Sequence, residues 1–224
     1  MKEHYQIAID GLSGAGKSTL AKALARELHI TYIDTGALYR SVGLYMYRHN
    51  IDPTDTQAVE RALPDVRITL THRDGEQIVL LNGEDVSAAI RENLISRYAS
   101  DVSRQPAVRA ALLDTQRDIA ARTSVVMDGR DIGTVILPDA EVKIYLDAPD
   151  TLRAHRRWLE LLERGQQAEE ADILRQMRQR DAQDSTREIA PAVKAPDAVI
   201  LSSDQPFEAL LAEAAALVRS RISG

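Results

Sequence analysis

Five short apolar runs alternate with longer helical patterns along this chain. The runs are residues 5–10, 29–34, 123–128, 142–147 and 197–202. Helical patterns separate or follow them, among them residues 17–28, 36–50 and 207–222. This alternation is typical of βαβ units, in which helices cover both faces of a parallel sheet. We therefore predict an α/β fold with a five-stranded parallel sheet flanked by helices.

One region departs from this alternation. Residues 66–87 carry alternating apolar side chains and two turn signals, RDG and NG, with no long helical pattern between them. Such a pattern favours an antiparallel hairpin or a small sheet. We predict a β-containing insert over residues 64–92, with residues 1–63 and 93–224 forming the core.

Composition excludes several classes of protein. The chain has 224 residues, of which 44% are hydrophobic, which is enough for a buried core and excludes a disordered chain. A net charge of −6 argues against a protein that coats nucleic acid, and zero cysteines exclude disulfides and thiolate metal sites. No run resembles a signal peptide or a membrane span. We expect a cytoplasmic monomer with no nucleic-acid or membrane partner.

The stretch IDGLSGAGKST at residues 9–19 matches the phosphate-binding pattern GxxxxGK[ST], with a predicted strand before it and a predicted helix after it. Glycines let successive backbone N–H groups surround a phosphate, and the helix N-terminus adds further donors. Lys17, expected as an exposed loop side chain, would reach the β- and γ-phosphates, and the Ser18 hydroxyl would ligate Mg²⁺. The residues assigned to ATP are Gly11, Leu12, Ser13, Gly14, Ala15, Gly16, Lys17, Ser18 and Thr19.

Such a loop serves both phosphotransferases and nucleotide-driven switches. A GTPase switch normally carries an Asn-Lys-x-Asp motif, and this sequence has none. A kinase needs a second anion-binding pocket, for which DTGALYR at residues 34–40 is one candidate. Asp34 could hold Mg²⁺ through water, and Arg40 could hold the phosphate of an acceptor. The alternative is that Thr35 is an N-cap and Arg40 a surface residue.

A second candidate is MDGRDIGTVILPDA at residues 127–140, at the end of the third predicted strand. Ligand sites in open α/β sheets lie beyond the carboxyl ends of the strands. Asp128 stands where an acid that supports Mg²⁺ is expected, and Arg130 and Asp131 would point into the same crevice. The alternative for all three is a charged surface turn.

Four segments together resemble the bacterial cytidylate kinases: IDGLSGAGKST, DTGALYR, DGRDIGTVILPDAEVKIYLDA and RDAQDSTREIAP. The resemblance runs from the first strand to about Pro191. It implies a P-loop kinase fold with a monophosphate-binding insert, matched here by residues 64–92, and a helical lid over about 148–190. It also implies transfer of the γ-phosphate of ATP, with Mg²⁺, to CMP or dCMP. The alternative is a P-loop kinase of the shikimate or gluconate type. The insert and the arginines of the segment RDAQDSTREIAP argue against it.

The resemblance also assigns individual residues. It implies that Arg40, Arg130 and Arg187 bind the acceptor phosphate, and that Thr35 stands where serine is common in the CMP site. It implies that Ser100, Arg109 and Asp131 surround the cytosine, with Arg180 and Asp184 near the sugar. The implied catalytic residues are Lys17, Asp128, Arg130 and Arg187.

The chain holds 23 arginines and 5 lysines, and several arginines fall where a lid is expected. Arg153, Arg156 and Arg157 cannot all share one helix face at their spacing. We expect one or two of them to bridge the phosphates on closure, with Arg157 assigned to ATP, and the others to be solvated. We expect Arg164 to be a surface residue.

Overall fold

The computed structural model describes residues 4–73, 76–163 and 165–222. These residues belong to two compact units. Unit 1 comprises Met1–Tyr32 and Ala120–Gly224, and unit 2 comprises Ile33–Ile119.

Unit 1 contains the larger sheet, whose strand order is β2-β6-β1-β7-β8. Strand β1 pairs in parallel with β6 and β7, and β7 pairs in parallel with β8. The predicted α/β fold with a five-stranded parallel sheet is therefore confirmed. The elements, with β2 crossing the boundary between the units, are β1 (Gln6–Asp10), α1 (Lys17–Leu28), β2 (Thr31–Asp34), β6 (Val125–Gly129), the π-helical turn η3 (Ile132–Ile136), β7 (Val142–Asp147), α6 (Asp150–Glu163), α7 (Glu170–Thr186), β8 (Val199–Ser202) and α8 (Phe207–Ile222).

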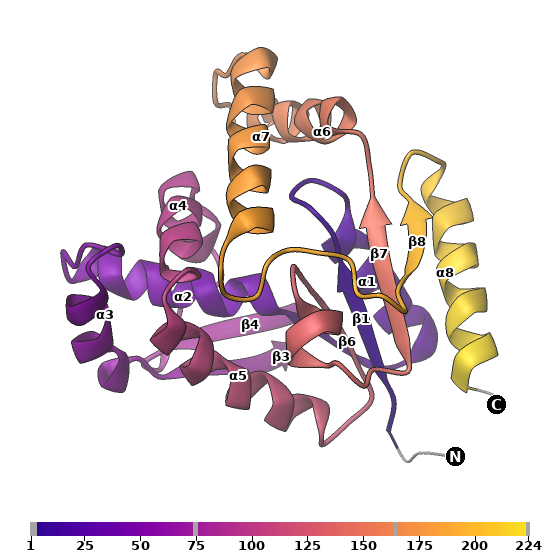
Figure 1. Cartoon of the computed structure of the whole chain (residues 1–224), viewed down its shortest axis with the longest axis horizontal. Coiled ribbons are helices and arrows are strands. Elements are labelled where there is room, and N and C mark those ends of the chain that lie inside the picture. The colour runs from indigo at the N-terminus through magenta and orange to yellow at the C-terminus, as the bar shows by residue number, and fades with distance from the viewer. Residues whose placement is uncertain (1–3, 74–75, 164, 223–224) are drawn as a thin grey trace. The chain divides into compact units, whose positions relative to one another are not determined.

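Helices α1 and α8 lie side by side and cover one face of this sheet (Figure 1). Ile7 and Ile9 of β1 and Leu24 of α1 are buried in the same apolar cluster as Leu210 and Val218 of α8. The alternation of side chains along β1 places Ile7 and Ile9 on the same face of the sheet. Burial of this apolar face fixes the position of α1, and hence of the loop that precedes it.

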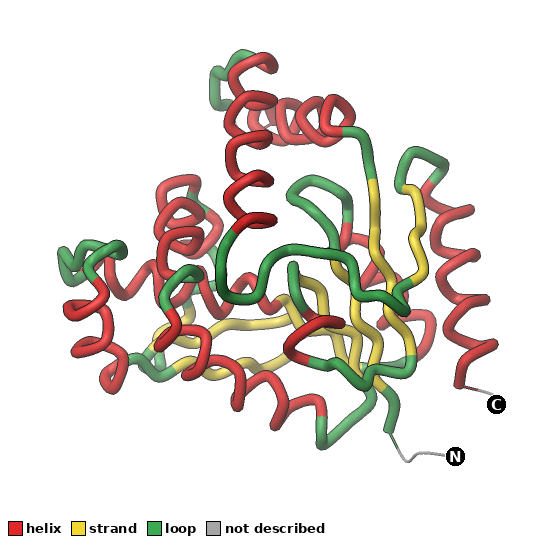
Figure 2. The backbone as a smooth tube through the Cα atoms, in the orientation of Figure 1, coloured by secondary structure: helices red, strands yellow, loops and turns green. Residues whose placement is uncertain are grey.

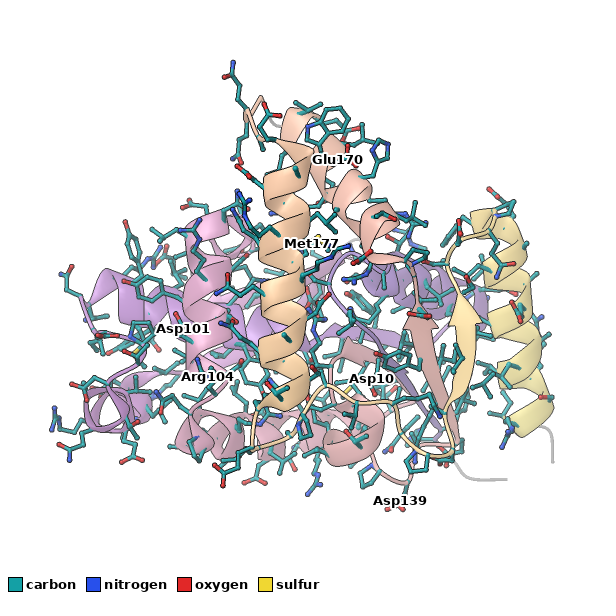
Figure 3. All side chains as sticks on the ribbon, turned by 45° about the horizontal axis from the view of Figure 1, so that its top comes forward. Asp10, Asp101, Arg104, Asp139, Glu170 and Met177 are labelled. Carbon is teal, nitrogen blue, oxygen red and sulfur yellow. The ribbon has the colours of Figure 1, made fainter. Side chains whose placement is uncertain are left out.

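Helices α6 and α7 form a helical hairpin with a small apolar core of its own. Met177, labelled in Figure 3, packs from α7 with Ala154 and Leu161 of α6. Trp158 contributes its ring to the same cluster and donates Nε1–H to the carbonyl of Ala168 over 3.0 Å. The segment predicted as a lid is thus two packed helices.

Unit 2 holds a small antiparallel sheet in the order β3-β4-β5, as the pattern of residues 66–87 predicted. Asn82 and Gly83 have φ values of 50° and 87°, which suits the tight turn between β4 and β5. The elements of unit 2 are α2 (Thr35–Arg48), α3 (Thr56–Ala62), η1 (Leu63–Asp65), β3 (Ile68–Arg73), β4 (Glu76–Leu81), β5 (Glu84–Asp85), η2 (Ala89–Arg91), α4 (Asn93–Val102) and α5 (Pro106–Ala120).

Figure 2 shows how the helices and strands follow one another along the chain. Unit 2 has its own apolar core, in which α2 packs against α4 and β4. The insert boundaries at residues 64 and 92 remain a prediction. Among the described residues, no helix combines the length and apolar character needed to cross a bilayer.

Candidate active site

The loop between β1 and α1 has the conformation that phosphate binding requires. Gly11 has a φ of 148°, and a Cβ placed on it would lie 2.3 Å from the carbonyl oxygen of Leu146. Only glycine therefore fits at this position. Helix α1 begins at Lys17, and no side chain caps its N-terminus at Gly16. The first amide N–H groups of α1 can consequently serve an anion.

Lys17 is only 7% exposed, so the expectation of an exposed loop lysine was wrong. Its Nζ donates to the carbonyl oxygen of Leu12 over 2.8 Å. Burial lowers the pKa of Lys17 to about 7, the positive charge of Arg130 acts in the same direction, and Asp128 and Asp10 oppose both. A bound triphosphate would add negative charge beside this buried amine and would favour its protonated form.

Asp128, near the end of β6, is buried and faces α1. Its Oδ2 accepts a hydrogen bond from Ser18 Oγ over 2.9 Å, and its Oδ1 accepts one from Tyr32 Oη over 2.9 Å. A hydroxyl and a carboxylate side by side are oxygen donors of the kind that Mg²⁺ prefers, and Mg²⁺ usually takes its remaining ligands from water and substrate phosphate. Ser18 and Asp128 therefore fit a Mg²⁺ site. Tyr32 was missed, since nothing in the sequence signalled its contact with Asp128.

The predicted acceptor-binding residues of unit 1 lie in two places, directly after β6 (Arg130 and Asp131) and on or directly after α7 (Arg180, Asp184 and Arg187). Arg130 donates Nη1–H to the Gly11 carbonyl and Nε–H to Asp184 Oδ2, each over 3.1 Å. Asp131 Oδ1 lies 3.7 Å from Arg187 Nη2. The structure thus brings together four of the predicted residues beside the phosphate-binding loop. Arg180 is close enough to Lys17 to contribute to the lowering of the pKa of Lys17.

Asp10, which sequence reasoning did not select, lies at the centre of this region and is labelled in Figure 3. It is 2% exposed, and its two carboxylate oxygens accept the backbone N–H groups of Ile132 and Gly133. Burial raises the pKa of Asp10 to about 6, and the nearby charge of Asp131 adds to the rise. Its position directly before Gly11 was the one available signal.

The three lid arginines have different environments. Arg153 is buried, neither solvated nor exposed for a ligand: its Nη1 lies 2.8 Å from Asp181 Oδ2 and donates to the Ser13 carbonyl over 3.0 Å. Arg156 donates to the hydroxyl and the carbonyl of Ser203. Arg157 pairs with Glu160 over 2.9 Å on the same helix. Arg164 lies outside the described residues.

In unit 2, the start of α2 corrects one expectation. Asp34, not Thr35, is the N-cap: its carboxylate accepts the N–H of Ala37 over 3.0 Å. The same carboxylate pairs with Arg40 Nη2 over 2.6 Å, so Arg40 is not a free surface residue. Thr35 is buried as the first residue of α2.

Ser100 and Arg109 lie on α4 and α5, and Pro106 begins α5 as its fixed φ predicts. Arg109 is 8% exposed, its guanidinium lies 5.6 Å from the centre of the Tyr39 ring, and it donates to the Ser103 carbonyl over 3.3 Å. The carbonyl of Ser100 accepts the hydroxyl of Ser103. Tyr39 thus lies beside a predicted base-binding arginine, a contact that its sequence position did not reveal.

A phosphate-binding loop that follows the central strand β1 of a parallel sheet, with a carboxylate near the end of the neighbouring strand β6, is typical of the P-loop nucleotide-binding proteins, the class to which the P-loop kinases belong. Two solved structures share this fold. A gluconokinase from Sinorhizobium meliloti 1021 superposes with a TM-score of 0.50 at 15% identity, over 98% of this chain and 94% of that one. An uncharacterized protein from Eubacterium ventriosum ATCC 27560 gives 0.52 at 14% identity, over 99% of each chain. At these identities the likeness concerns the fold alone.

The chain belongs to the cytidylate kinase family, whose model matches residues 7–220. It is 47% identical over 197 residues to a cytidylate kinase of Caldicellulosiruptor saccharolyticus, covering 88% of this chain and 87% of that protein. It is 46% identical over 220 residues to a cytidylate kinase of Solibacter usitatus, covering 97% and 93%. The resemblance noted from four sequence segments is confirmed.

Proposed function

We propose that this protein transfers the γ-phosphate of ATP to CMP or dCMP, giving ADP and CDP or dCDP. The observation that carries the proposal is the hydrogen bond from Arg130 to the Gly11 carbonyl. It joins the loop that would bind the phosphate donor to a residue proposed to bind the acceptor phosphate. Membership of the cytidylate kinase family supports the choice of a cytosine nucleotide.

On the donor side, residues 11–19 would surround the ATP phosphates with backbone N–H groups. Lys17 would neutralise charge on the β- and γ-phosphates. Arg157 is proposed to contact ATP, which would require it to leave Glu160. Ser18 and Asp128 would hold Mg²⁺, which when bound would offset negative charge on the ATP phosphates.

On the acceptor side, Arg40, Arg130 and Arg187 are proposed to bind the CMP phosphate, because a planar guanidinium suits bidentate recognition of phosphate. The proposed base-binding residues are Ser100, Arg109 and Asp131. Arg180 and Asp184 would bind the sugar, and Thr35 would line the acceptor site. Several of these side chains form ion pairs with carboxylates in the structure: Arg130 with Asp184, Arg187 with Asp131, and Arg40 with the neighbouring Asp34.

The chemistry asks mainly for positioning and charge stabilisation. The attacking phosphate oxygen of CMP is already anionic, so no strong general base is needed. Lys17 and the proposed acceptor-binding arginines would stabilise charge on the transferring group while water is excluded. We further propose that residues 64–92 close over the monophosphate rather than over ATP, and that the α6–α7 hairpin acts as the lid over the phosphates.

A coupled assay of ADP release tests the proposal. The purified protein is offered CMP, dCMP, UMP, AMP, shikimate and gluconate, each with ATP and Mg²⁺. We expect high turnover with CMP and dCMP and little with the others. Faster turnover with a small acid would support the alternative kinase class instead. Gel filtration in the same buffer tests the expected monomer, and the cytoplasmic location stays a prediction.

A further inference from the structure

We infer that Asp10 is a positioning residue for the acceptor side of the reaction. Its carboxylate holds the two backbone amides that follow Asp131 and thereby sets the direction of the Asp131 side chain. The inference rests on the proposed function, in which Asp131 contacts the cytosine base.

Asp10 is buried, and both of its carboxylate oxygens accept a backbone hydrogen bond. Asp10 Oδ1 accepts the N–H of Ile132 over 2.7 Å, and Oδ2 accepts the N–H of Gly133 over 2.8 Å. Hydrogen bonds to an ionised acceptor are stronger than neutral ones, and water has little access to a side chain that is 2% exposed. Two hydrogen bonds therefore hold the start of η3 against the end of β1.

The hydrogen bonds to Asp10 take the place of a helix cap by the side chain of Asp131. Asp131 occupies the cap position of η3, where an aspartate side chain often accepts the first amides of its own helix. Here the Asp131 side chain makes no such bond, and Asp10 binds those amides from the end of another strand. The Asp131 carboxylate instead lies 3.7 Å from Arg187 Nη2. Asp10 thus performs the capping and lets Asp131 face other groups.

Two further observations show that the segment 130–133 is tightly held. A Cβ placed on Gly133 would lie 3.1 Å from Lys143 Cδ and 3.3 Å from Asp10 Oδ2, so a side chain at position 133 would crowd both groups. On the other side of Asp131, Arg130 donates to the Gly11 carbonyl. The residues on both sides of Asp131 are therefore held by hydrogen bonds: Arg130 bonds to Gly11, and Ile132 bonds to Asp10.

The charged groups around Asp10 come from three elements besides β1. Asp131 precedes η3 and raises the pKa of Asp10, Lys17 of α1 lowers it, and Tyr145 of β7 is near enough to interact with its charge. Lys143 of β7 packs its stem against Gly133. Burial raises the pKa of Asp10 to about 6. The two hydrogen bonds that its carboxylate accepts from Ile132 and Gly133 should therefore weaken as the pH falls through that value.

The first test is Asp10→Asn, which keeps the shape but places an NH₂ group against one of the two N–H donors. We expect KM for CMP to rise about tenfold or more, and the kcat/KM ratio of CMP over UMP to fall by a similar factor. The dissociation constant for ATP should change far less. Asp147→Asn is the matched control, because Asp147 ends the neighbouring strand β7, is exposed, and loses the same charge.

Two further measurements separate positioning from stability. The amide proton shifts of Ile132 and Gly133 should titrate near pH 6 in the wild-type protein and not in Asp10→Asn. A lower unfolding midpoint with unchanged KM and an unchanged CMP-to-UMP ratio would overturn the inference. If Asp10→Asn fails to fold, Gly133→Ala keeps the carboxylate but crowds its contact with residue 133, and it should change KM for CMP and the CMP-to-UMP ratio in the same directions.

A double substitution tests whether Asp10 acts through Asp131. In an Asp131→Ala background, Asp10→Asn should not further lower the ratio of kcat/KM for CMP to kcat/KM for UMP. Additive effects of the two substitutions on this ratio would contradict the inference. A wild-type protein without CMP activity would overturn the proposed function. Wild-type CMP activity with an unchanged ratio in Asp10→Asn would overturn only the role of Asp10.

Discussion

Ser18 Oγ donates a hydrogen bond to Asp128 Oδ2 over 2.9 Å and so ties the first turn of α1 to the end of β6. The two residues are 110 positions apart in the sequence, and each comes from a motif identified separately. Their contact places a hydroxyl and a carboxylate next to the phosphate-binding loop. This pair is the basis of the metal prediction below.

Ser18→Ala should raise the Mg²⁺ concentration needed for half-maximal activity by about tenfold, because one oxygen ligand is lost. Activity titrations with Mg²⁺ at saturating ATP measure the shift. Binding of Mn²⁺ in the presence of ADP, followed by electron paramagnetic resonance, gives a readout independent of turnover. Ser220→Ala on α8, whose hydroxyl bonds the Leu217 carbonyl, is the control and should change neither quantity. Unaltered Mn²⁺ binding in Ser18→Ala would exclude Ser18 as a ligand.

Lys17→Met should lower kcat by about a thousandfold or more, because the amine that stabilises charge on the transferring phosphate is removed. The fold should survive, since methionine suits a buried position and the nearby carboxylates of Asp10 and Asp128 keep their other hydrogen bonds. Circular dichroism and the unfolding midpoint check the fold. Lys22→Met, on the same helix, should keep near-normal turnover. Near-normal turnover in Lys17→Met itself would contradict the assignment of the loop.

ATP binding should take up a proton at pH 8. Burial lowers the pKa of Lys17 to about 7, so the amine is mostly neutral at pH 8. Bound phosphates favour the charged amine and raise its pKa, so affinity should fall as pH rises above 7, by up to about tenfold per pH unit. Calorimetry at pH 8 in two buffers of different ionisation enthalpy measures the uptake. Lys17→Met should show none, and equal uptake in both proteins would assign the proton elsewhere.

Asp131→Ala should reduce kcat/KM for CMP much more than for UMP. The cytosine amino group donates to a carboxylate, whereas uracil presents a carbonyl oxygen at that place and leaves the buried Asp131 facing an acceptor. Sites built around hydrogen bonds discriminate strongly, so the wild-type preference for CMP should be large. Kinetics with both nucleotides measure the ratio. A variant that kept the full preference would show that another residue reads the base.

Asp181→Asn should lower the free energy of unfolding by about 3 kcal/mol, because it leaves the buried Arg153 guanidinium without its carboxylate. Urea denaturation measures the loss. Asp172→Asn on the same helix removes an exposed pair with Arg175 and should change stability by less than about 0.5 kcal/mol. Equal effects of the two substitutions would mean that burial of Arg153 does not strengthen its pair.

The sequence was sufficient for the features that depend on neighbouring residues. The phosphate-binding loop needs only the spacing from Gly11 to Ser18 between a strand and a helix, and these residues are close in space because they are close in the chain. The strands and the antiparallel region were likewise readable, since alternation and turn residues act over a few positions. The family motifs then named most of the candidate site residues.

The tertiary structure alone decided which distant groups touch. Asp10 binds amides of residues 132 and 133, Tyr32 binds Asp128, and Arg153 is buried against Asp181 and the Ser13 carbonyl. It also decided that Lys17 is buried and that Asp34 rather than Thr35 caps α2. Burial and long-range hydrogen bonding depend on how the whole sheet and its helices pack, and packing shifts the pKa of a side chain through desolvation. A local motif names the side chain, but only the fold supplies its surroundings.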